Sequence, residues 1–226
     1  MLLHSPLVGP STWAPVAREL TAQGFSVRVP SLVRVAEGGP PFWPRVAAAV
    51  TGALADAPPD QPVALVAHSN GGLFVPVVRA AVRQPVISSI FVDARLPGTT
   101  GGTPVAEGEF LASLRRLVQP DGLLPRWTEW WGDADLGPLF PDEATRERVS
   151  AEQPRLPLAY FEQRVPVPDG WDDHPSAYLL FSPAYADLAQ RARKDGWAVR
   201  HLPGEHLHQL VDPASTVREL LSLALR

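Results

Sequence analysis

The sequence predicts an α/β protein with a mostly parallel, open sheet, helices on both of its faces, and a helical insertion. Two observations support this fold class. Short apolar runs alternate along the chain with longer amphipathic stretches, which is the pattern of parallel strands joined by crossover helices. Residues 63–67 (VALVA) are apolar on both faces, as is typical of a central strand. The 226 residues, 45% of them hydrophobic, suffice for one domain with a substantial core.

The alternation predicts strands and helices in a regular order. The predicted strands are residues 1–4, 25–29, 63–67, 86–94, 177–181 and 197–202. The predicted helices are residues 11–24, 42–56, 73–83, 184–196 and 212–225. In the first helix we expect Ser11 or Thr12 as the N-cap and Gly24 as the stop. Pro76 must bend the third helix or lie near its first turn.

The alternation breaks between about residues 97 and 175, where Pro, Gly and Trp are frequent. Two stretches in this span, 108–118 and 141–154, have amphipathic character. We therefore expect residues 98–175 to form a helical lid, with 1–97 and 176–226 as the core. Residues 98–103 (GTTGGT) have neither the strand–helix context nor the lysine of a phosphate loop, so they are interpreted as the hinge into the lid.

Composition excludes several classes of function. The formal net charge of −4 argues against binding to a nucleic-acid backbone, which needs clustered Lys and Arg. Because the chain has no cysteine, disulfides, thiolate metal sites and a cysteine nucleophile are excluded. The sequence contains no apolar stretch long enough to span a membrane and no pattern of a signal peptide. A cytoplasmic protein is the resulting expectation.

A serine stands where the strand 63–67 should meet the next helix, in Ala67-His68-Ser69-Asn70-Gly71. A nucleophile on a sharp strand-to-helix turn needs small residues two positions away on each side, because the backbone is crowded there. Such a turn lifts the hydroxyl clear of the sheet, and N–H groups at the helix start can hold an oxyanion. The alternative is an ordinary turn that contains a serine.

Three segments, taken in this order, resemble the α/β-hydrolase family over nearly the whole chain. LLHSPLVGPSTW (2–13) resembles the first strand and oxyanion loop, AHSNGG (67–72) the nucleophile elbow, and LPGEHLHQLVDP (202–213) the C-terminal histidine segment. The resemblance implies a serine hydrolase that uses no cofactor and no metal, with serine preceding histidine along the chain. The start at MLLH implies a shortened N-terminus, in which one or two family strands are absent, or a misassigned start codon.

A serine hydroxyl needs a general base, and histidine has a suitable pKa. The resemblance implies a histidine seven residues before the proline of an Asp-Pro pair, which is His206 when counted back from Pro213. His208 is the alternative. We expect His4 to organise its loop and His68 to pack beside the elbow.

The third member of a triad is a carboxylate, and here the sequence leaves alternatives open. The family usually carries it after the next-to-last strand, but the only carboxylate of FSPAYADL is Asp187, which should lie within the following helix. A second family arrangement has the acid after the preceding strand, where Asp93 stands. Asp93 is favoured, with Asp187 and the pair Asp172 and Asp173 as alternatives.

The oxyanion hole departs from the family pattern. One donor should be the N–H of Asn70, directly after the nucleophile. The residue expected to supply the second donor is Pro6, which has no N–H. The N–H of Leu7 or the Ser5 hydroxyl would have to substitute, or the loop is rearranged. Losing one such donor can cost about 3 kcal/mol of transition-state stabilisation.

The predicted lid carries Trp127, Trp130 and Trp131, which would share one face of a helix. They are expected either to fix the lid to the core or to wall an apolar pocket over Ser69. The function predicted is hydrolysis of a carboxylic ester, thioester or lactone of a bulky or aromatic small molecule. The alternatives are a cofactor-free lyase, cyclase or C–C hydrolase, and a non-catalytic small-molecule binding protein. A homodimer is compatible with the sequence.

Overall fold

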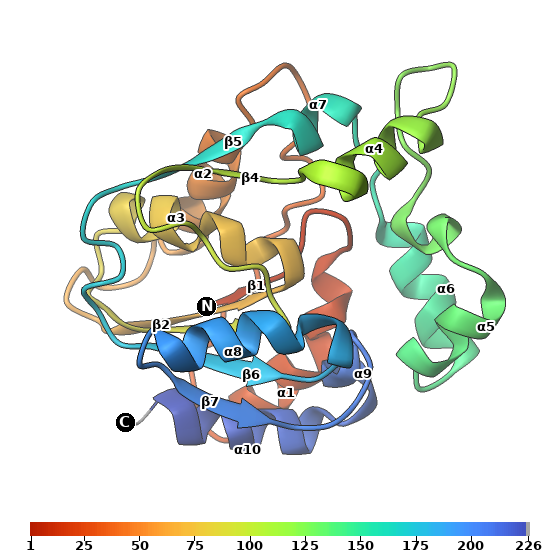
Figure 1. Cartoon of the computed structure of the whole chain (residues 1–226). Coiled ribbons are helices and arrows are strands. Elements are labelled where there is room, and N and C mark those ends of the chain that lie inside the picture. The colour runs from red at the N-terminus through yellow and green to blue at the C-terminus, as the bar shows by residue number, and fades with distance from the viewer. Residues whose placement is uncertain (225–226) are drawn as a thin grey trace.

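The computed structural model describes residues 1–224 and contains a five-stranded parallel sheet (Figure 1). The strand order is β1-β2-β3-β6-β7, and every neighbouring pair is parallel. The strands are β1 (Leu2–Leu3), β2 (Val63–His68), β3 (Val86–Val92), β6 (Ser176–Leu180) and β7 (Ala198–His201). The predicted mostly parallel α/β architecture is confirmed.

Helices cover both faces of this sheet (Figure 1). One face carries α1 (Ala14–Ala22) and α10 (Pro213–Ala224), and the other carries α2 (Trp43–Ala53), α3 (Val75–Ala81) and α8 (Ala186–Lys194). The side chains of β3 alternate accordingly: Ile90 and Val92 pack with α1 and α10, whereas Phe91 packs on the other side. Successive strand residues point to opposite faces, so a strand that is apolar throughout can join two separate cores.

One predicted strand and the predicted N-cap of the first helix were wrong. Residues 25–29 are not a strand, although the Arg28 carbonyl accepts one hydrogen bond from Leu2 N (2.9 Å). The first helix begins with a 3-10 turn, η1 (Pro10–Trp13), and neither Ser11 nor Thr12 caps it. The cap position falls on Gly9 because Pro10 favours the first helical position, and Thr12 Oγ1 donates to the Gly9 carbonyl (2.8 Å).

The third predicted helix is shorter than expected. Pro76 lies in the first turn of α3 and does not bend it, and α3 ends at Ala81, before the expected Arg83. Beyond this end the Gln84 side chain donates to two carbonyl groups that follow α2. These bonds draw the chain away from the helical path. Of the last predicted helix, Leu225 lies outside the described residues.

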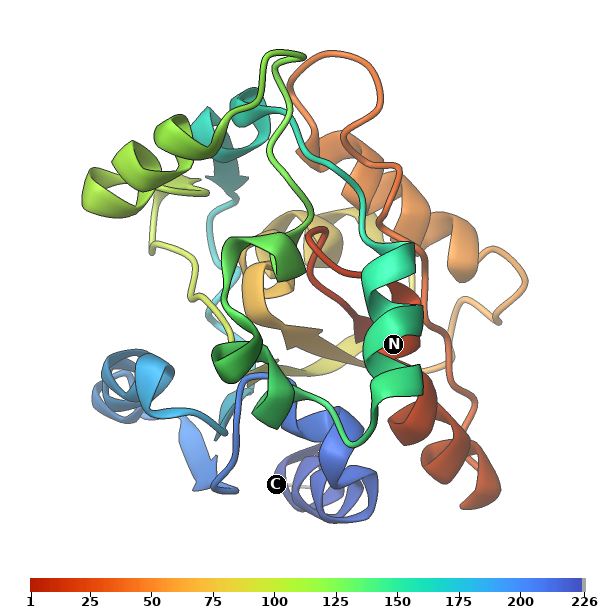
Figure 2. The same cartoon turned by 90° about the vertical axis from the view of Figure 1, so that its right-hand side faces the viewer.

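The segment between β3 and β6 arches over the carboxyl ends of the strands (Figures 1 and 2). Its elements are β4 (Gly101–Pro104), α4 (Gly108–Leu117), η3 (Trp127–Trp130), α5 (Asp133–Leu136), η4 (Gly137–Leu139), α6 (Glu143–Glu152), α7 (Leu158–Glu162) and β5 (Arg164–Val167). β4 and β5 form an antiparallel pair that closes the base of the arch. The sequence does not predict this pair, and β4 includes part of the expected hinge.

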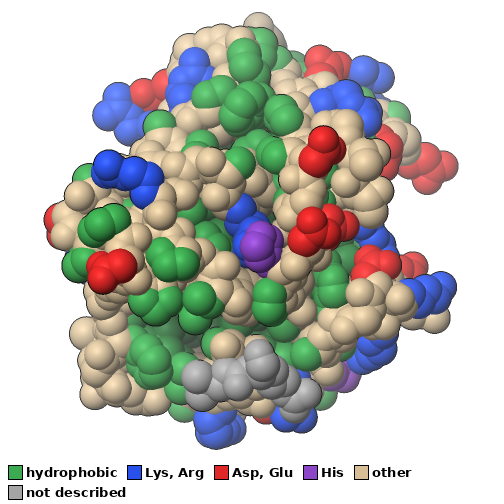
Figure 3. Space-filling view, turned by 90° about the vertical axis from the view of Figure 1, so that its left-hand side faces the viewer, with side chains coloured by type: hydrophobic (Ala, Val, Ile, Leu, Met, Phe, Trp, Pro, Cys, Tyr) green, Lys and Arg blue, Asp and Glu red, His purple; other side chains and the backbone are tan. Residues whose placement is uncertain are grey.

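The two ends of the sheet differ in character. Figure 3 faces the amino ends of the strands, where charged side chains lie both near the centre and around the edge of the surface, and hydrophobic side chains gather below the centre. A large cavity opens at the carboxyl ends, under the arch. Within residues 1–224, no helix is both long enough and apolar enough to cross a membrane.

Candidate active site

Ser69 lies on a sharp turn between β2 and α3. Its φ of +55° is in the left-handed region, which residues with a side chain rarely adopt. A Cβ atom on Gly71 would lie 3.1 Å from the His4 carbonyl oxygen, and one on Gly72 would lie 2.3 Å from the Arg95 carbonyl oxygen. Glycine is therefore required at position 72, where a Cβ would overlap the backbone, and a Cβ at position 71 would fit only if the neighbouring backbone shifted by a few tenths of an ångström. The close approach of these carbonyl oxygens explains why small residues follow the serine in the sequence.

Asp93 also follows directly on a strand, β3, and also has a positive φ, +41°. Its fully buried carboxylate is surrounded by donors. Oδ1 accepts hydrogen bonds from the N–H groups of Phe181 (2.9 Å) and Ser182 (3.0 Å), and Oδ2 accepts one from Ser182 Oγ (2.6 Å). Oδ2 is also 2.8 Å from His206 Nδ1. These bonds compensate the desolvation of a buried carboxylate and fix its orientation.

The alternative carboxylates lie elsewhere. Asp187 is exposed in the first turn of α8, and Asp172 and Asp173 are exposed in the loop before β6. Among the described residues, the ion pair of His206 is with Asp93. The structure thus brings together the favoured pair and keeps the three alternatives away from the imidazole.

Aromatic rings surround the His206 imidazole. Tyr185 stacks on it with a ring-centroid distance of 4.8 Å and an interplanar angle of 5°. His68 packs at 4.5 Å, and its Nε2 is 2.7 Å from the His206 carbonyl oxygen. Trp127 lies at 6.2 Å. Burial, followed by the proximity of His206, lowers the pKa of His68 well below its usual value, so His68 is neutral at pH 7 and does not repel a protonated His206.

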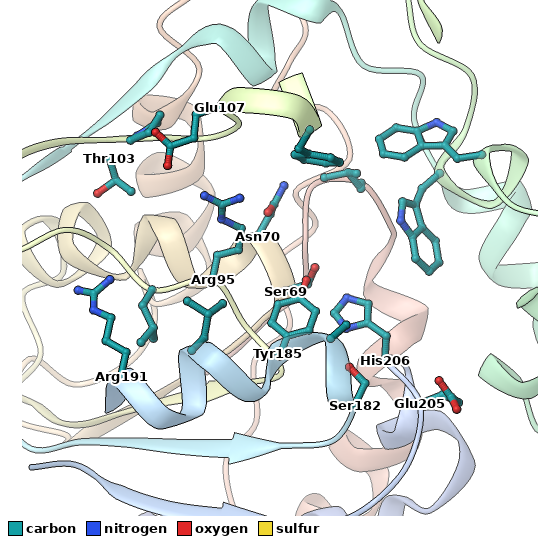
Figure 4. A pocket seen from close by; sticks show the side chains of 18 of the residues that line it. Ser69, Asn70, Arg95, Thr103, Glu107, Ser182, Tyr185, Arg191, Glu205 and His206 are labelled. Carbon is teal, nitrogen blue, oxygen red and sulfur yellow. The ribbon is translucent and has the colours of Figure 1, made fainter. Parts of the chain in front are cut away.

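Ser69, Tyr185 and His206 lie together at one side of the cavity (Figure 4). Burial raises the pKa of Tyr185 to about 12, and the nearby Ser69 side chain opposes this rise. Because Asp93 holds Nδ1 of His206, the second ring nitrogen, Nε2, is the one left to accept a proton. His208, the alternative base, begins α9 (His208–Val211) and packs on Phe181 instead, with ring centroids 5.5 Å apart.

His4 organises its loop, as predicted. It is fully buried, and the Leu32 N–H donates to its Nε2 (2.9 Å). Nδ1 therefore carries the proton and donates to the Ser5 carbonyl oxygen (2.8 Å). Burial lowers the pKa of His4 from 6.5 to about 4. Between these two values the unfolded chain binds a proton that the folded chain does not, so the free energy of unfolding decreases as the pH falls.

We expect this one histidine to reduce the free energy of unfolding by about 3 kcal/mol between pH 7 and pH 4. The measurement is the melting temperature over this pH range for wild type, His4→Gln and His201→Gln. His201 is exposed and serves as the matched control. His4→Gln should be less stable at pH 7 but less sensitive to acid, while His201→Gln should follow wild type. An equally steep acid sensitivity in His4→Gln would contradict the assignment.

The loop after β1 holds the residues expected to complete an oxyanion hole. Asn70 lies in the first turn of η2 (Ser69–Phe74), where backbone N–H groups have no partner within the helix. Pro6 contributes no N–H. Leu7 lines the cavity, and its N–H donates to Ser5 Oγ (3.3 Å). Because this hydrogen bond is long and therefore weak, the Leu7 N–H is the second candidate donor to an oxyanion.

A cavity of about 850 Å³ joins these groups to the arch. Trp127, Trp130 and Trp131 all line it. Trp130 is anchored, since its Nε1 donates to the Pro125 carbonyl oxygen (2.9 Å) and its ring packs on Phe161. Trp131 is 48% exposed. The three tryptophans therefore combine packing within the arch with contact to the cavity.

Four further residues of this region were not identified from the sequence. Ser182 contacts the Asp93 carboxylate, Tyr185 stacks on His206, and Arg95 and Arg191 line the cavity. From the sequence, segment 181–188 is of interest only for its carboxylate, Asp187. Its position after a strand next to β3 would have been a signal for Ser182 and Tyr185, because the carboxyl ends of neighbouring parallel strands meet.

Comparison with solved structures places this fold among known proteins. Over 98% of the chain, the structure is similar to an extracellular α/β-hydrolase from a Paenibacillus species (TM-score 0.76, 16% identity, 97% of that chain). It is similar over the same share to polyneuridine aldehyde esterase (0.71, 13%, 97%) and to a methylesterase from Arabidopsis (0.69, 17%, 96%).

A pyrethroid hydrolase matches at 20% identity with a TM-score of 0.70, over 99% of this chain and 95% of its own. No family model matches the sequence, and no curated protein matches it. The likeness therefore lies in the three-dimensional structure. The order of the sheet, the turn at Ser69 and these neighbours agree: the chain has the α/β-hydrolase fold, as the sequence resemblance implied.

Proposed function

We propose that this protein is a serine hydrolase that cleaves a carboxylic ester, thioester or lactone of a bulky or aromatic small molecule. The observation that carries the proposal is the 2.8 Å contact between His206 Nδ1 and the buried Asp93 carboxylate, at the cavity into which the Ser69 turn opens. Esterases and other hydrolases among the structural neighbours agree with it.

In the proposed reaction, Ser69 Oγ attacks the carbonyl carbon while His206 Nε2 takes the hydroxyl proton. The Asn70 N–H donates to the oxyanion of the tetrahedral intermediate, and His206 returns the proton to the leaving alcohol or thiol. Water then attacks the acyl-serine with His206 again as base, which releases the acid and restores the Ser69 hydroxyl. Asp93 holds the imidazole in the required tautomer and stabilises its protonated form.

The proposal is tested by labelling with a fluorophosphonate, which reacts with an activated serine. Wild type should lose activity in a time-dependent way and carry the label on the peptide that contains Ser69, and Ser69→Ala should take up none. The absence of time-dependent labelling in wild type would favour a non-catalytic binding protein instead.

A second candidate is a cofactor-free lyase, cyclase or C–C hydrolase that uses His206 as a general base. The observation that favours it is Pro6, which removes the backbone donor that ordinary acyl transfer on this fold would use. Product analysis in isotope-labelled water separates the candidates. Lyase or cyclase chemistry incorporates no labelled oxygen, whereas ester hydrolysis and C–C hydrolysis each incorporate one into the acid. These two differ in the second product, which is an alcohol or thiol from the ester and a product with a new C–H bond from C–C cleavage.

We further propose that Trp127 walls the acyl part of the cavity. Trp127→Ala should lower kcat/KM for a naphthoate ester more than for an acetate ester, because lost aromatic contact is worth about 1–3 kcal/mol. The ratio of the two values should fall roughly ten- to a hundredfold. Trp197 is the matched control, since it stacks on Phe91 (5.1 Å) outside the cavity lining. Trp197→Ala should lower the melting temperature and leave the ratio unchanged. An unchanged ratio in Trp127→Ala would assign its side chain to packing alone.

A further inference from the structure

Arg95 brings a positive charge into the cavity beside the proposed nucleophile. Its backbone N–H donates to the Ser69 carbonyl oxygen (3.1 Å), which fixes it to the elbow. Its half-buried side chain lines the cavity together with Ser69 and Asn70 (Figure 4). Within residues 1–224, its guanidinium has neither a hydrogen-bond acceptor nor an ion-pair partner. A partly buried cation with five free donors gains free energy from any anion that reaches it.

Arg191 lines the same cavity from α8. Its Nη2 donates to the Pro97 carbonyl oxygen (2.7 Å), and its Nε lies 3.5 Å from the Asp195 carboxylate. These contacts hold the side chain against the wall of the cavity. Figure 4 shows Arg95, Arg191, Thr103 and Glu107 toward one end of the cavity, with indole side chains at the other end. The cavity is therefore polar at one end and aromatic at the other.

Acidic residues also line the cavity, but none of them pairs with Arg95 in the described part of the chain. These residues are Glu107, Asp135 and Glu205. Of these, Glu107 lies at the polar end, and no ion pair within 4 Å joins it to Arg95 in the described part of the chain. Glu205 lies next to His206, away from both arginines (Figure 4). Arg191 is paired with Asp195 and Glu107 lies at the same end, so two guanidinium groups stand against two carboxylates there, and it is the Arg95 guanidinium that makes no ion pair in the described part of the chain.

We propose that Arg95, assisted by Arg191, binds a carboxylate on the substrate, so that the preferred substrate is an ester that carries a free carboxylate elsewhere in the molecule. This inference rests on the proposed ester hydrolysis for its catalytic readout. The planar guanidinium can hold a carboxylate through two parallel hydrogen bonds. Because Arg95 is fixed to the elbow backbone, a bound carboxylate would orient the scissile carbonyl relative to Ser69.

The catalytic test compares p-nitrophenyl hydrogen suberate with p-nitrophenyl methyl suberate, which differ in one charge and one methyl group. Wild type should prefer the charged ester in kcat/KM by roughly 10- to 100-fold, and added salt should reduce the preference. Arg95→Met should bring the ratio of the two values close to one. Arg18→Met, an exposed substitution on α1, is the matched control and should keep the wild-type ratio.

A binding test makes the inference independent of turnover. Calorimetry should show that Ser69→Ala binds monomethyl suberate, which carries one carboxylate, more tightly than dimethyl suberate. The double variant Ser69→Ala/Arg95→Met should lose this difference. Charge-dependent binding without turnover of either ester would overturn the proposed hydrolysis and leave the carboxylate site standing. An unchanged charge preference in both Arg95→Met proteins would overturn the carboxylate site, whatever the activity.

Discussion

Replacing Ser69 with alanine is expected to lower kcat/KM for a short p-nitrophenyl ester by about 10⁵-fold or more. Without Oγ the chain has no nucleophile at the elbow, and His206 can activate only water. The Cβ of alanine fits the same positive-φ position that serine occupies, so the fold and melting temperature should be retained. Ser88→Ala, a buried substitution in β3 outside the cavity, is the matched control and should keep wild-type turnover. Wild-type turnover in Ser69→Ala would contradict the proposed nucleophile.

Asp93→Asn is expected to lower kcat by about 10⁴-fold. Asparagine can still accept the N–H groups of Phe181 and Ser182 through its oxygen, which leaves its NH2 group facing His206 Nδ1. A donor at this position favours the tautomer in which Nδ1 accepts and Nε2 carries the proton. That tautomer cannot take the proton of the Ser69 hydroxyl. The variant also loses the charge that stabilises the imidazolium.

Asp187→Asn is the matched control for this substitution. Asp187 is exposed in α8 and makes no contact with His206, so kcat should stay close to wild type. The measurement is kcat at saturating ester for both variants, with melting temperatures to exclude unfolding. A large loss in Asp187→Asn together with a small loss in Asp93→Asn would place the acid after β6 and contradict the account.

The parallel sheet could be predicted because its strands carry the signal within themselves. Residues 63–67 are apolar on both faces, and the structure buries Val63, Leu65, Val66 and Ala67 between two helical layers. The strand predicted at 25–29 failed because a single backbone hydrogen bond, from Leu2 to Arg28, links this segment to β1. The antiparallel pair β4–β5 was not predicted because its partners lie about sixty residues apart, and a short Gly-Pro-rich strand has little pattern of its own.

Each of the three candidate residues has its own signal in the sequence: Ser69 has small neighbours at a strand-to-helix turn, Asp93 follows a strand, and His206 stands where the family resemblance implies the histidine. The structure brings the Asp93 and His206 side chains into contact and opens the Ser69 turn to the same cavity. Arg95 has no comparable signal, and Tyr185 has only its place after β6. Stacking on an imidazole and the absence of an acceptor for a guanidinium are properties of the tertiary arrangement, and one residue among nineteen arginines is not distinguished by its type.

Covalent catalysis at Ser69 can be tested by trapping the acyl-enzyme. Wild type mixed with a p-nitrophenyl ester and quenched in acid within the first turnover should carry the acyl mass on the peptide that contains Ser69. The burst of p-nitrophenol should approach one per active site. Product formation with no acyl group on that peptide, or with an equal acyl mass in Ser69→Ala, would contradict the account.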